Sequence, residues 1–223
     1  MTKITEQMTL AGRAIEVDSF DLIDTEAGSR AKYTDEEWPL VRRMIHASGD
    51  FDFNGLTEFH PNAVVSGVAA IRKGGTRIVA DVEMICAGLS APRLEYFGMT
   101  ALRFIADPDV VERARAQGST RAVQAMRKAH CEACLDGAIV GIGNAPTALL
   151  EVIRLVRAEG AKPSLIIGMP VGFVSAVESK DMLMTLEEVP WISVRGRKGG
   201  STLVVAAIHA LLALAQTGRE ENG

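Results

Sequence analysis

The most constraining feature of this 223-residue chain is the alternation, from residue 76 onward, of short apolar runs with longer segments of helical periodicity. The apolar runs are rich in β-branched residues, and some are almost continuously apolar, as is typical of parallel strands covered on both faces. The alternation therefore predicts an α/β fold, a three-layer α/β/α sandwich with a mainly parallel central sheet. The predicted strands cover residues 77–81, 101–105, 138–142, 164–168 and 191–195.

The segments between these runs carry helix signals. Thr34 and Glu37 have the spacing of a capping box, and the regular helix that follows should begin near Trp38. Ser119 precedes a second helical pattern, and Gly160 is a typical residue for the end of a third. The predicted helices cover residues 33–49, 60–75, 107–118, 119–135, 147–160 and 201–218.

Composition favours one self-sufficient domain. Hydrophobic residues make up 48% of the chain, enough for a sizeable core without disulfides or a structural metal. No low-complexity linker, internal repeat or abrupt change of composition divides the chain. We therefore predict a single domain over residues 1–223, with residues 1–10 mobile.

Charge and hydropathy exclude several classes of protein. The net charge is −4, with acidic and basic residues intermixed, whereas nucleic-acid binding usually requires a basic surface. No apolar run approaches the roughly 20 residues of a membrane span, and the N-terminal residues lack a signal-peptide pattern. The odd count of three cysteines argues against an exported disulfide scaffold. We predict a cytoplasmic protein that binds neither nucleic acid nor membrane.

The loops after the predicted strands are the expected place for a ligand, because open parallel sheets bind ligands at the carboxyl ends of their strands. Several of these loops are rich in glycine and proline, and they contain Arg93, Lys180, Arg195, Arg197 and Lys198. Cations and exposed backbone amides around one crevice indicate a receptor for a ligand with several negative groups. The alternative is that the glycines only turn the chain and the cations are solvated. The loops cover residues 81–93, 106–109, 143–147, 168–181 and 195–201.

The stretch "GAIVGIGNAPTALLEV" (137–152) runs from an apolar strand through a glycine-rich turn into a helix, a typical anion-binding arrangement. A dinucleotide fingerprint requires a third glycine, but Pro146 stands in that place after Gly141 and Gly143. No acidic residue ends the next strand to hold a ribose, and no lysine completes a phosphate-binding loop. The turn is thus expected to bind an anion other than a nucleotide.

Cys131 and Cys134 form a C-x-x-C pair next to His130, which raises the possibility of zinc or redox chemistry. Four-ligand zinc sites usually take two such pairs, and Cys86 stands alone. The pair also lies at the end of a predicted helix, whereas redox pairs lie at the start of one. We expect no bound metal, with metal or redox chemistry as the minor alternative.

His46 differs from the other histidines because it lies off the apolar stripe of its predicted helix. It occupies the last turn before Gly49, where the helix dipole favours a protonated imidazole, while Arg42 and Arg43 disfavour it. A histidine under such opposing influences can serve as both acid and base. From these residues alone, a surface histidine without a function is the favoured interpretation, and an acid–base histidine is the alternative.

Four stretches together resemble the precorrin-8X methylmutases (precorrin isomerases) of cobalamin biosynthesis. The resemblance runs from about Ser19 to the C-terminal helix, and it implies a flavodoxin-like fold and a homodimer with the site near the subunit interface. It also implies a 1,5-sigmatropic shift of a methyl group from C-11 to C-12 of precorrin-8X, giving hydrogenobyrinate without a cofactor. The stretches are "VRRMIHASGDFDF" (41–53), "GIGNAPTALLEV" (141–152), "GMPVGFVSAVESKD" (168–181) and "VRGRKGGS" (194–201).

The resemblance also suggests a set of site residues. His46 matches the family's catalytic histidine, which donates a proton to the macrocycle and then takes it back, while Ser19 and Arg43 match substrate contacts. Arg121 resembles the family's carboxylate-binding arginine, and the turn at 143–147 would then cradle carboxylates of the tetrapyrrole. Further substrate contacts are predicted in the loops, at Ser90, Asn144, Thr147, Lys180 and Ser201.

Three alternatives stay open at this point. The same methyl shift could act on cobalt-precorrin-8, although no added ligand for cobalt is evident and the metal-free substrate is favoured. The protein could carry a corrinoid without turnover, or it could be a nucleotide-dependent flavodoxin-like protein. As an enzyme it could also hand its product to the next enzyme of the pathway.

Overall fold

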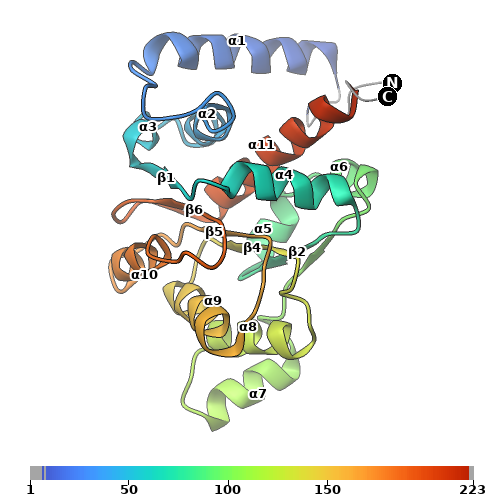
Figure 1. Ribbon diagram of the computed structural model, residues 1–223, viewed down its shortest axis with the longest axis vertical. Coiled ribbons are helices and arrows are strands. Elements are labelled where there is room, and N and C mark those ends of the chain that lie inside the picture. Colours follow the sequence, from blue (N-terminus) through green and yellow to red (C-terminus); the bar gives the residue numbers. More distant parts are fainter. Residues whose placement is uncertain (1–6, 8, 221–223) are drawn as a thin grey trace.

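The computed structural model of the chain describes residue 7 and residues 9–220 (Figure 1). Its centre is a six-stranded sheet in the order β1-β6-β5-β4-β2-β3, in which β1 is antiparallel to β6 and all other pairs are parallel. The predicted α/β fold with a mainly parallel sheet is confirmed. The strands are β1 (Thr57–Phe59), β2 (Arg77–Ala80), β3 (Thr100–Leu102), β4 (Ile139–Ile142), β5 (Leu165–Gly168) and β6 (Trp191–Val194).

All five predicted strands are present, and their parallel order follows a known pattern. Counted along the chain from β2 to β6, these strands lie in the order 2-1-3-4-5, which is the order of flavodoxin-like sheets. The edge strand β1 was missed, because the N-terminal third was predicted to be helical. It contains only three residues, and it depends on pairing with β6, as in the registered pair Glu58 and Ser193.

The predicted helices are present with small shifts at their ends. Before α2, the amide of Thr34 donates to Glu37 and the amide of Glu37 donates to the Thr34 hydroxyl, which is the predicted capping box. Helix α8 begins after Thr120 rather than Ser119, because the Thr120 hydroxyl accepts from the amide of Val123. The helices are α1 (Leu10–Glu26), α2 (Trp38–Ser48), α3 (Phe53–Leu56), α4 (Ala63–Lys73), α5 (Glu83–Gly88), α6 (Ala91–Tyr96), α7 (Pro108–Ala116), α8 (Arg121–Cys131), α9 (Pro146–Glu159), α10 (Ala176–Leu183) and α11 (Ser201–Glu220).

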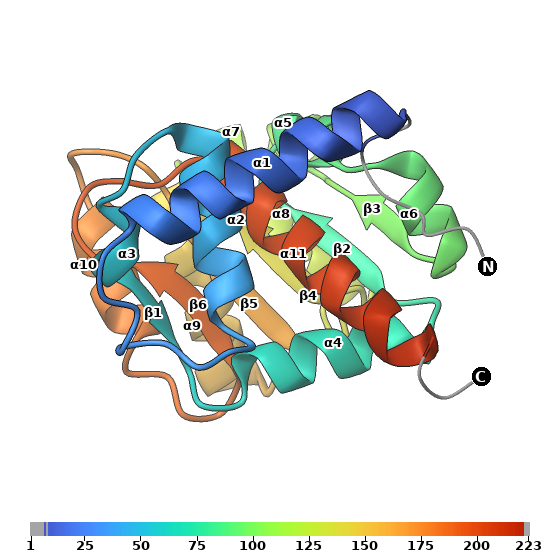
Figure 2. The same ribbon diagram turned by 90° about the horizontal axis from the view of Figure 1, so that it is seen from above.

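The helices form layers on both faces of the sheet (Figure 1). Helices α2, α4 and α11 cover one face, while α8, α9 and α10 cover the other. Figure 2 shows α1 as an additional helix that crosses the outside of α2 and α11. Apolar residues of α11 such as Val204, Ile208 and Leu211 are fully buried. Helix α11 begins directly after the loop that follows β6, so its first turn lies at the carboxyl edge of the sheet.

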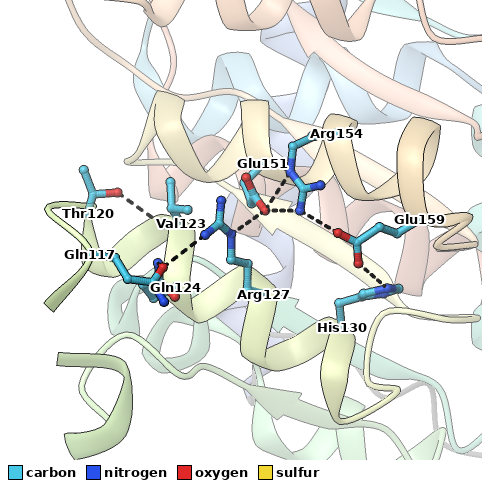
Figure 3. A network of polar contacts seen from close by, with 9 residues as sticks. All are labelled: Gln117, Thr120, Val123, Gln124, Arg127, His130, Glu151, Arg154 and Glu159. Atoms are coloured by element: carbon cyan, nitrogen blue, oxygen red, sulfur yellow. Dashed lines mark hydrogen bonds and ion pairs between the residues drawn. The ribbon is translucent and has the colours of Figure 1, made fainter. Parts of the chain in front are cut away.

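A polar network joins α8 and α9 in the layer opposite α11 (Figure 3). The Glu151 carboxylate accepts from Arg127 at 2.8 Å and from Arg154 at 2.6 Å, and Arg154 also pairs with Glu159 at 2.9 Å. Burial raises the pKa of Glu151, but the hydrogen bonds from the two arginines outweigh burial and hold that pKa below its ordinary value. The network continues to His130, whose Nε2 lies 3.2 Å from a Glu159 oxygen. We assign it a structural role in fastening two helices.

The C-x-x-C pair begins at the last residue of α8, Cys131, directly after His130 of this network. Cys131 is exposed, Cys134 is buried, and both thiols are free. In the part of the chain that the structure describes, no group of three or more His, Cys, Asp and Glu residues could hold a metal ion. Likewise, none of the described helices has the length and apolar character required to cross a bilayer.

Candidate active site

His46 lines a pocket of about 320 Å³ at the carboxyl edge of the sheet. It projects from the last turn of α2 and is exposed, whereas Arg43, one turn earlier, is largely buried. Ser201 and His209 line the same pocket from α11, and Gly88 from the end of α5. The pocket therefore brings together three of the predicted site residues: His46, Arg43 and Ser201.

Helix α1 supplies the immediate surroundings of His46. The ring of Phe20 meets the imidazole edge-on, with 5.2 Å between the ring centroids, and the Arg43 guanidinium lies 5.4 Å from the centroid of the same ring. Arg43 also pairs with the Glu16 carboxylate. The predicted contact Ser19 precedes Phe20 in α1, and its hydroxyl donates to the carbonyl of Ile15 at 2.7 Å. Sequence reasoning missed Phe20 and Glu16, because only the packing of α1 on α2 gives them this place.

His209 joins α11 to the segment between α5 and α6. His209 lies within an apolar helix and is only 7% exposed, yet it also lines the His46 pocket. The amide of Ser90 donates to its Nε2 at 3.1 Å, and Arg93 donates to its backbone carbonyl at 3.1 Å. These contacts place the predicted substrate residue Ser90 beside the pocket.

The glycine-rich turn after β4 binds an anion that belongs to the chain itself. The amides of Gly143, Asn144 and Ala145 donate to the carboxylate of Asp81 at 3.1, 2.9 and 2.8 Å. Asp81 is fully buried, which raises the pKa of its carboxyl, while the three amides act in the opposite direction. In this structure the three amides are occupied by Asp81, and the contact of the turn with substrate carboxylates stays a prediction.

The glycine at 143 has a packing role as well. A Cβ atom at this position would lie 2.6 Å from the Cα atom of Ser201, closer than real Cβ contacts allow. The absence of a side chain therefore lets the start of α11 approach the turn.

The basic residues of the last two loops also have internal partners. The fully buried ammonium of Lys180 donates to the carbonyl of Lys198 at 2.7 Å. The Lys198 ammonium in turn pairs with Asp50 at 2.5 Å and with Asp52 at 2.6 Å. The hydrogen bond from Lys198 to Asp50 holds the pKa of Asp50 below its ordinary value. Together they fasten the loop before α11 to the segment that follows His46.

The remaining loop cations behave similarly. Arg195 pairs with Glu58 at 2.5 Å, and the guanidinium of Arg197 lies 5.5 Å from the ring centroid of Phe173. Arg93 is buried against α11. These loops therefore do not form the predicted crevice of free cations. Their basic side chains instead contact other loops and neighbouring segments of the chain.

Arg121, Asn144 and Thr147 lie elsewhere on the carboxyl edge. Arg121 begins α8 and lines a separate cavity of about 320 Å³ with Arg115 and neighbouring residues of α7. The hydroxyls of Thr120 and Thr147 are 3.1 Å apart, so the starts of α8 and α9 adjoin. None of these three predicted residues lines the His46 pocket, and their contact with substrate stays a prediction.

The buried Lys180 leads to a prediction about pH. Burial lowers the pKa of Lys180 from 10.5 to about 8. Lys180 is therefore protonated in the folded protein only at a lower pH than in the unfolded chain. The contribution of Lys180 to stability should therefore decrease as pH falls from 10.5 to about 8 and stay constant below that. NMR titration of the labelled side chain should give a midpoint near 8.

Unfolding by urea across the same pH range provides the second measurement. Relative to Lys180→Met, the wild-type protein should gain stability as pH rises through this range. A midpoint close to the ordinary lysine value, or parallel pH dependence in both proteins, would contradict the prediction.

Comparison with known proteins identifies what kind of enzyme carries this site. A parallel α/β sheet with a histidine pocket at its carboxyl edge is the arrangement of an enzyme that can use acid–base chemistry. Residues 14–214 match the family model described as precorrin-8X methylmutase. The chain belongs to the precorrin-8X methylmutase family, and it is an isomerase of cobalamin biosynthesis that transfers a methyl group within one molecule.

Relatives agree along nearly the whole chain. A cobalt-precorrin-8 methylmutase from Leptospira interrogans is 50% identical over 93% of this chain and 96% of its own length. A precorrin-8X methylmutase from a Sinorhizobium species is 40% identical over 90% of this chain and 93% of its own. The crystal structure of precorrin-8x methyl mutase from Thermus thermophilus is 51% identical, with a TM-score of 0.86, and the match covers 92% of this chain and 97% of that one.

Proposed function

We propose that this enzyme moves the methyl group from C-11 to C-12 of precorrin-8X to give hydrogenobyrinate, with His46 as acid and base. The observation that carries the proposal is the exposed imidazole of His46 in a pocket beside Arg43, in a chain of the precorrin-8X methylmutase family. The parallel strand order supports the inference of a flavodoxin-like fold with one added edge strand.

The proposed chemistry needs only one proton. Protonation of the conjugated macrocycle by His46 draws electrons away from C-11 and weakens its bond to the methyl group. The methyl group migrates to C-12, and the same imidazole takes the proton back. Arg43 and Ser19 are proposed substrate contacts, with Ser201 and Ser90 beside the pocket. Because donor and acceptor are the same side chain, the cycle closes without a cofactor.

Turnover by the purified protein tests the proposal. Added to precorrin-8X, the enzyme should produce the red shift of the chromophore that accompanies formation of hydrogenobyrinate, over many turnovers. A corrinoid carrier would bind the pigment but leave the methyl group on C-11. Binding followed by no conversion would therefore favour the carrier over the enzyme.

The metal state of the substrate is a separate question. The sequence favours the metal-free form, but relatives from Leptospira interrogans and Priestia megaterium, 50% and 49% identical, are cobalt-precorrin-8 methylmutases by name. Cobalt-precorrin-8 is therefore the second candidate substrate. Values of kcat/KM measured for both substrates with the same preparation decide between them.

We further propose that the enzyme is a homodimer with its site near the interface. Two outward surfaces expose large apolar side chains that a partner subunit could cover. They are Leu10, Ile15 and Leu22 of α1, and Phe173 and Val174 before α10, the last two more than 80% exposed. Sedimentation equilibrium gives the mass in solution. A cytoplasmic location and transfer of product to the next enzyme stay predictions.

A further inference from the structure

A second cavity, of about 460 Å³, lies next to the His46 pocket. It is formed between α1, α2 and α11, the three helices that cross in Figure 2. Arg43 lines both cavities, so the two adjoin at this side chain. We call it the α1 groove.

The α1 groove combines an apolar wall with positive charge. Phe20, Pro39 and Leu214 contribute apolar surface. Among the described residues that line the groove, Arg43 pairs with Glu16 and Arg42 pairs with Asp24, whereas no described carboxylate pairs with Arg13. Within the described part of the chain, Arg13 therefore places a positive charge next to apolar surface, which suits an apolar ligand with carboxylate groups.

Two of the arginines keep donor capacity for a ligand. Arg13 donates from Nε to the Gln7 carbonyl at 3.1 Å, and no carboxylate among the described residues pairs with it. Arg42 pairs through Nη1 with Asp24 at 2.6 Å, but its Nε is buried without a partner among the described residues. An unpaired buried donor is costly, and a shift of the partly exposed Arg42 side chain toward a ligand oxygen would give this donor an acceptor.

Size points the same way. Ligand cavities usually measure roughly 300–1,000 Å³, and a tetrapyrrole with eight peripheral groups belongs near the upper end of that range. The His46 pocket alone, at about 320 Å³, is too small to hold a whole tetrapyrrole. The macrocycle must therefore extend beyond it, and the neighbouring volume that carries cations is the α1 groove.

We propose that the α1 groove binds peripheral carboxylates at one edge of the tetrapyrrole while the macrocycle lies over His46, with Arg13 and Arg42 as the residues that recognise them. This inference rests on the proposed function, because it takes the substrate class from it. It assigns to α1 a role in substrate selection in addition to supporting Arg43.

Equilibrium binding of the product tests the groove independently of turnover. Hydrogenobyrinate is titrated into the full chain, and Kd is read from its absorbance. Arg13→Met and Arg42→Met should each raise Kd about tenfold and raise KM similarly, with kcat changed less than about twofold, since each removes a charge-assisted hydrogen bond. Arg113→Met on α7, which breaks an ion pair with Asp109 far from the groove, is the matched control and should leave Kd unchanged.

Amidated product separates a direct contact from a structural effect. If the arginines hold carboxylates, hydrogenobyrinate with its peripheral carboxylates amidated binds wild type weakly, and Arg13→Met weakens that binding no further. Equal losses for both ligands, or an unchanged Kd for the acid, would overturn the inference. Tight product binding by a protein that does not convert precorrin-8X would instead refute the proposed function and leave the groove intact.

Discussion

Replacing His46 with alanine should lower kcat of the methyl shift by about 10²–10⁴-fold, the usual contribution of a positioned acid–base group. The protein should still fold, because His46 is exposed and its imidazole packs only edge-on against the ring of Phe20 among the described aromatic residues. Its free energy of unfolding should change by less than about 0.5 kcal/mol. Conversion of precorrin-8X, followed by absorbance, gives kcat, and a urea titration gives the stability.

A second histidine provides the control. His130 lies between α8 and α9 and pairs with Glu159, so His130→Ala should leave turnover unchanged. Kd for hydrogenobyrinate should rise no more than a few-fold in His46→Ala, because the loss is in proton transfer and not in binding. Turnover close to wild type in His46→Ala would refute the assigned role.

The parts of the fold that could be predicted are those whose signal is local. Strands β4 and β5 are buried at every position, so their apolar β-branched runs are visible in the sequence itself. Gly160 adopts the left-handed conformation that ends α9, as predicted from its place after the apolar pattern. Capping and burial of this kind act over a few residues.

The parts that were missed depend on partners distant in sequence. Strand β1 is a strand because β6 lies beside it, and its residues Thr57–Phe59 carry no β-branched run. Helix α10 follows a glycine-rich loop and begins after Ser175, which has a positive φ of 59°. Nothing in the local composition distinguishes it from the loop.

The site shows the same division. The position of His46 off the apolar stripe could be derived from the helix pattern, but its proposed role as acid and base rests on the resemblance to a family. The contacts with Phe20 and Glu16 require α1 to pack across α2, and they leave no local signature. The glycine-rich turn at 143–145 predicts exposed backbone amides from its local sequence. The acceptor of these amides, Asp81, lies 62 residues before Gly143 and could not be predicted in this way.

Replacing Asp81 with alanine should destabilise the protein by about 3–5 kcal/mol, because it removes a fully buried acceptor from three backbone amides, that of the buried Gly143 and the partly buried ones of Asn144 and Ala145. Asp136 offers a matched control, since it is an exposed aspartate that accepts from a single amide, that of Lys162. Asp136→Ala should cost less than about 1 kcal/mol. Urea unfolding at constant pH measures both changes.

Asp81→Asn distinguishes the effect of losing the carboxylate from the effect of losing side-chain volume. The amide side chain keeps one accepting oxygen but turns a donor toward the turn, so we expect a loss between those of wild type and Asp81→Ala. The turn also abuts Ser201 of the His46 pocket, so kcat/KM should fall together with stability. If the amides of the turn instead serve the substrate, Asp81→Ala would keep its stability and product would bind more tightly, because the freed donors could reach a carboxylate of the ligand.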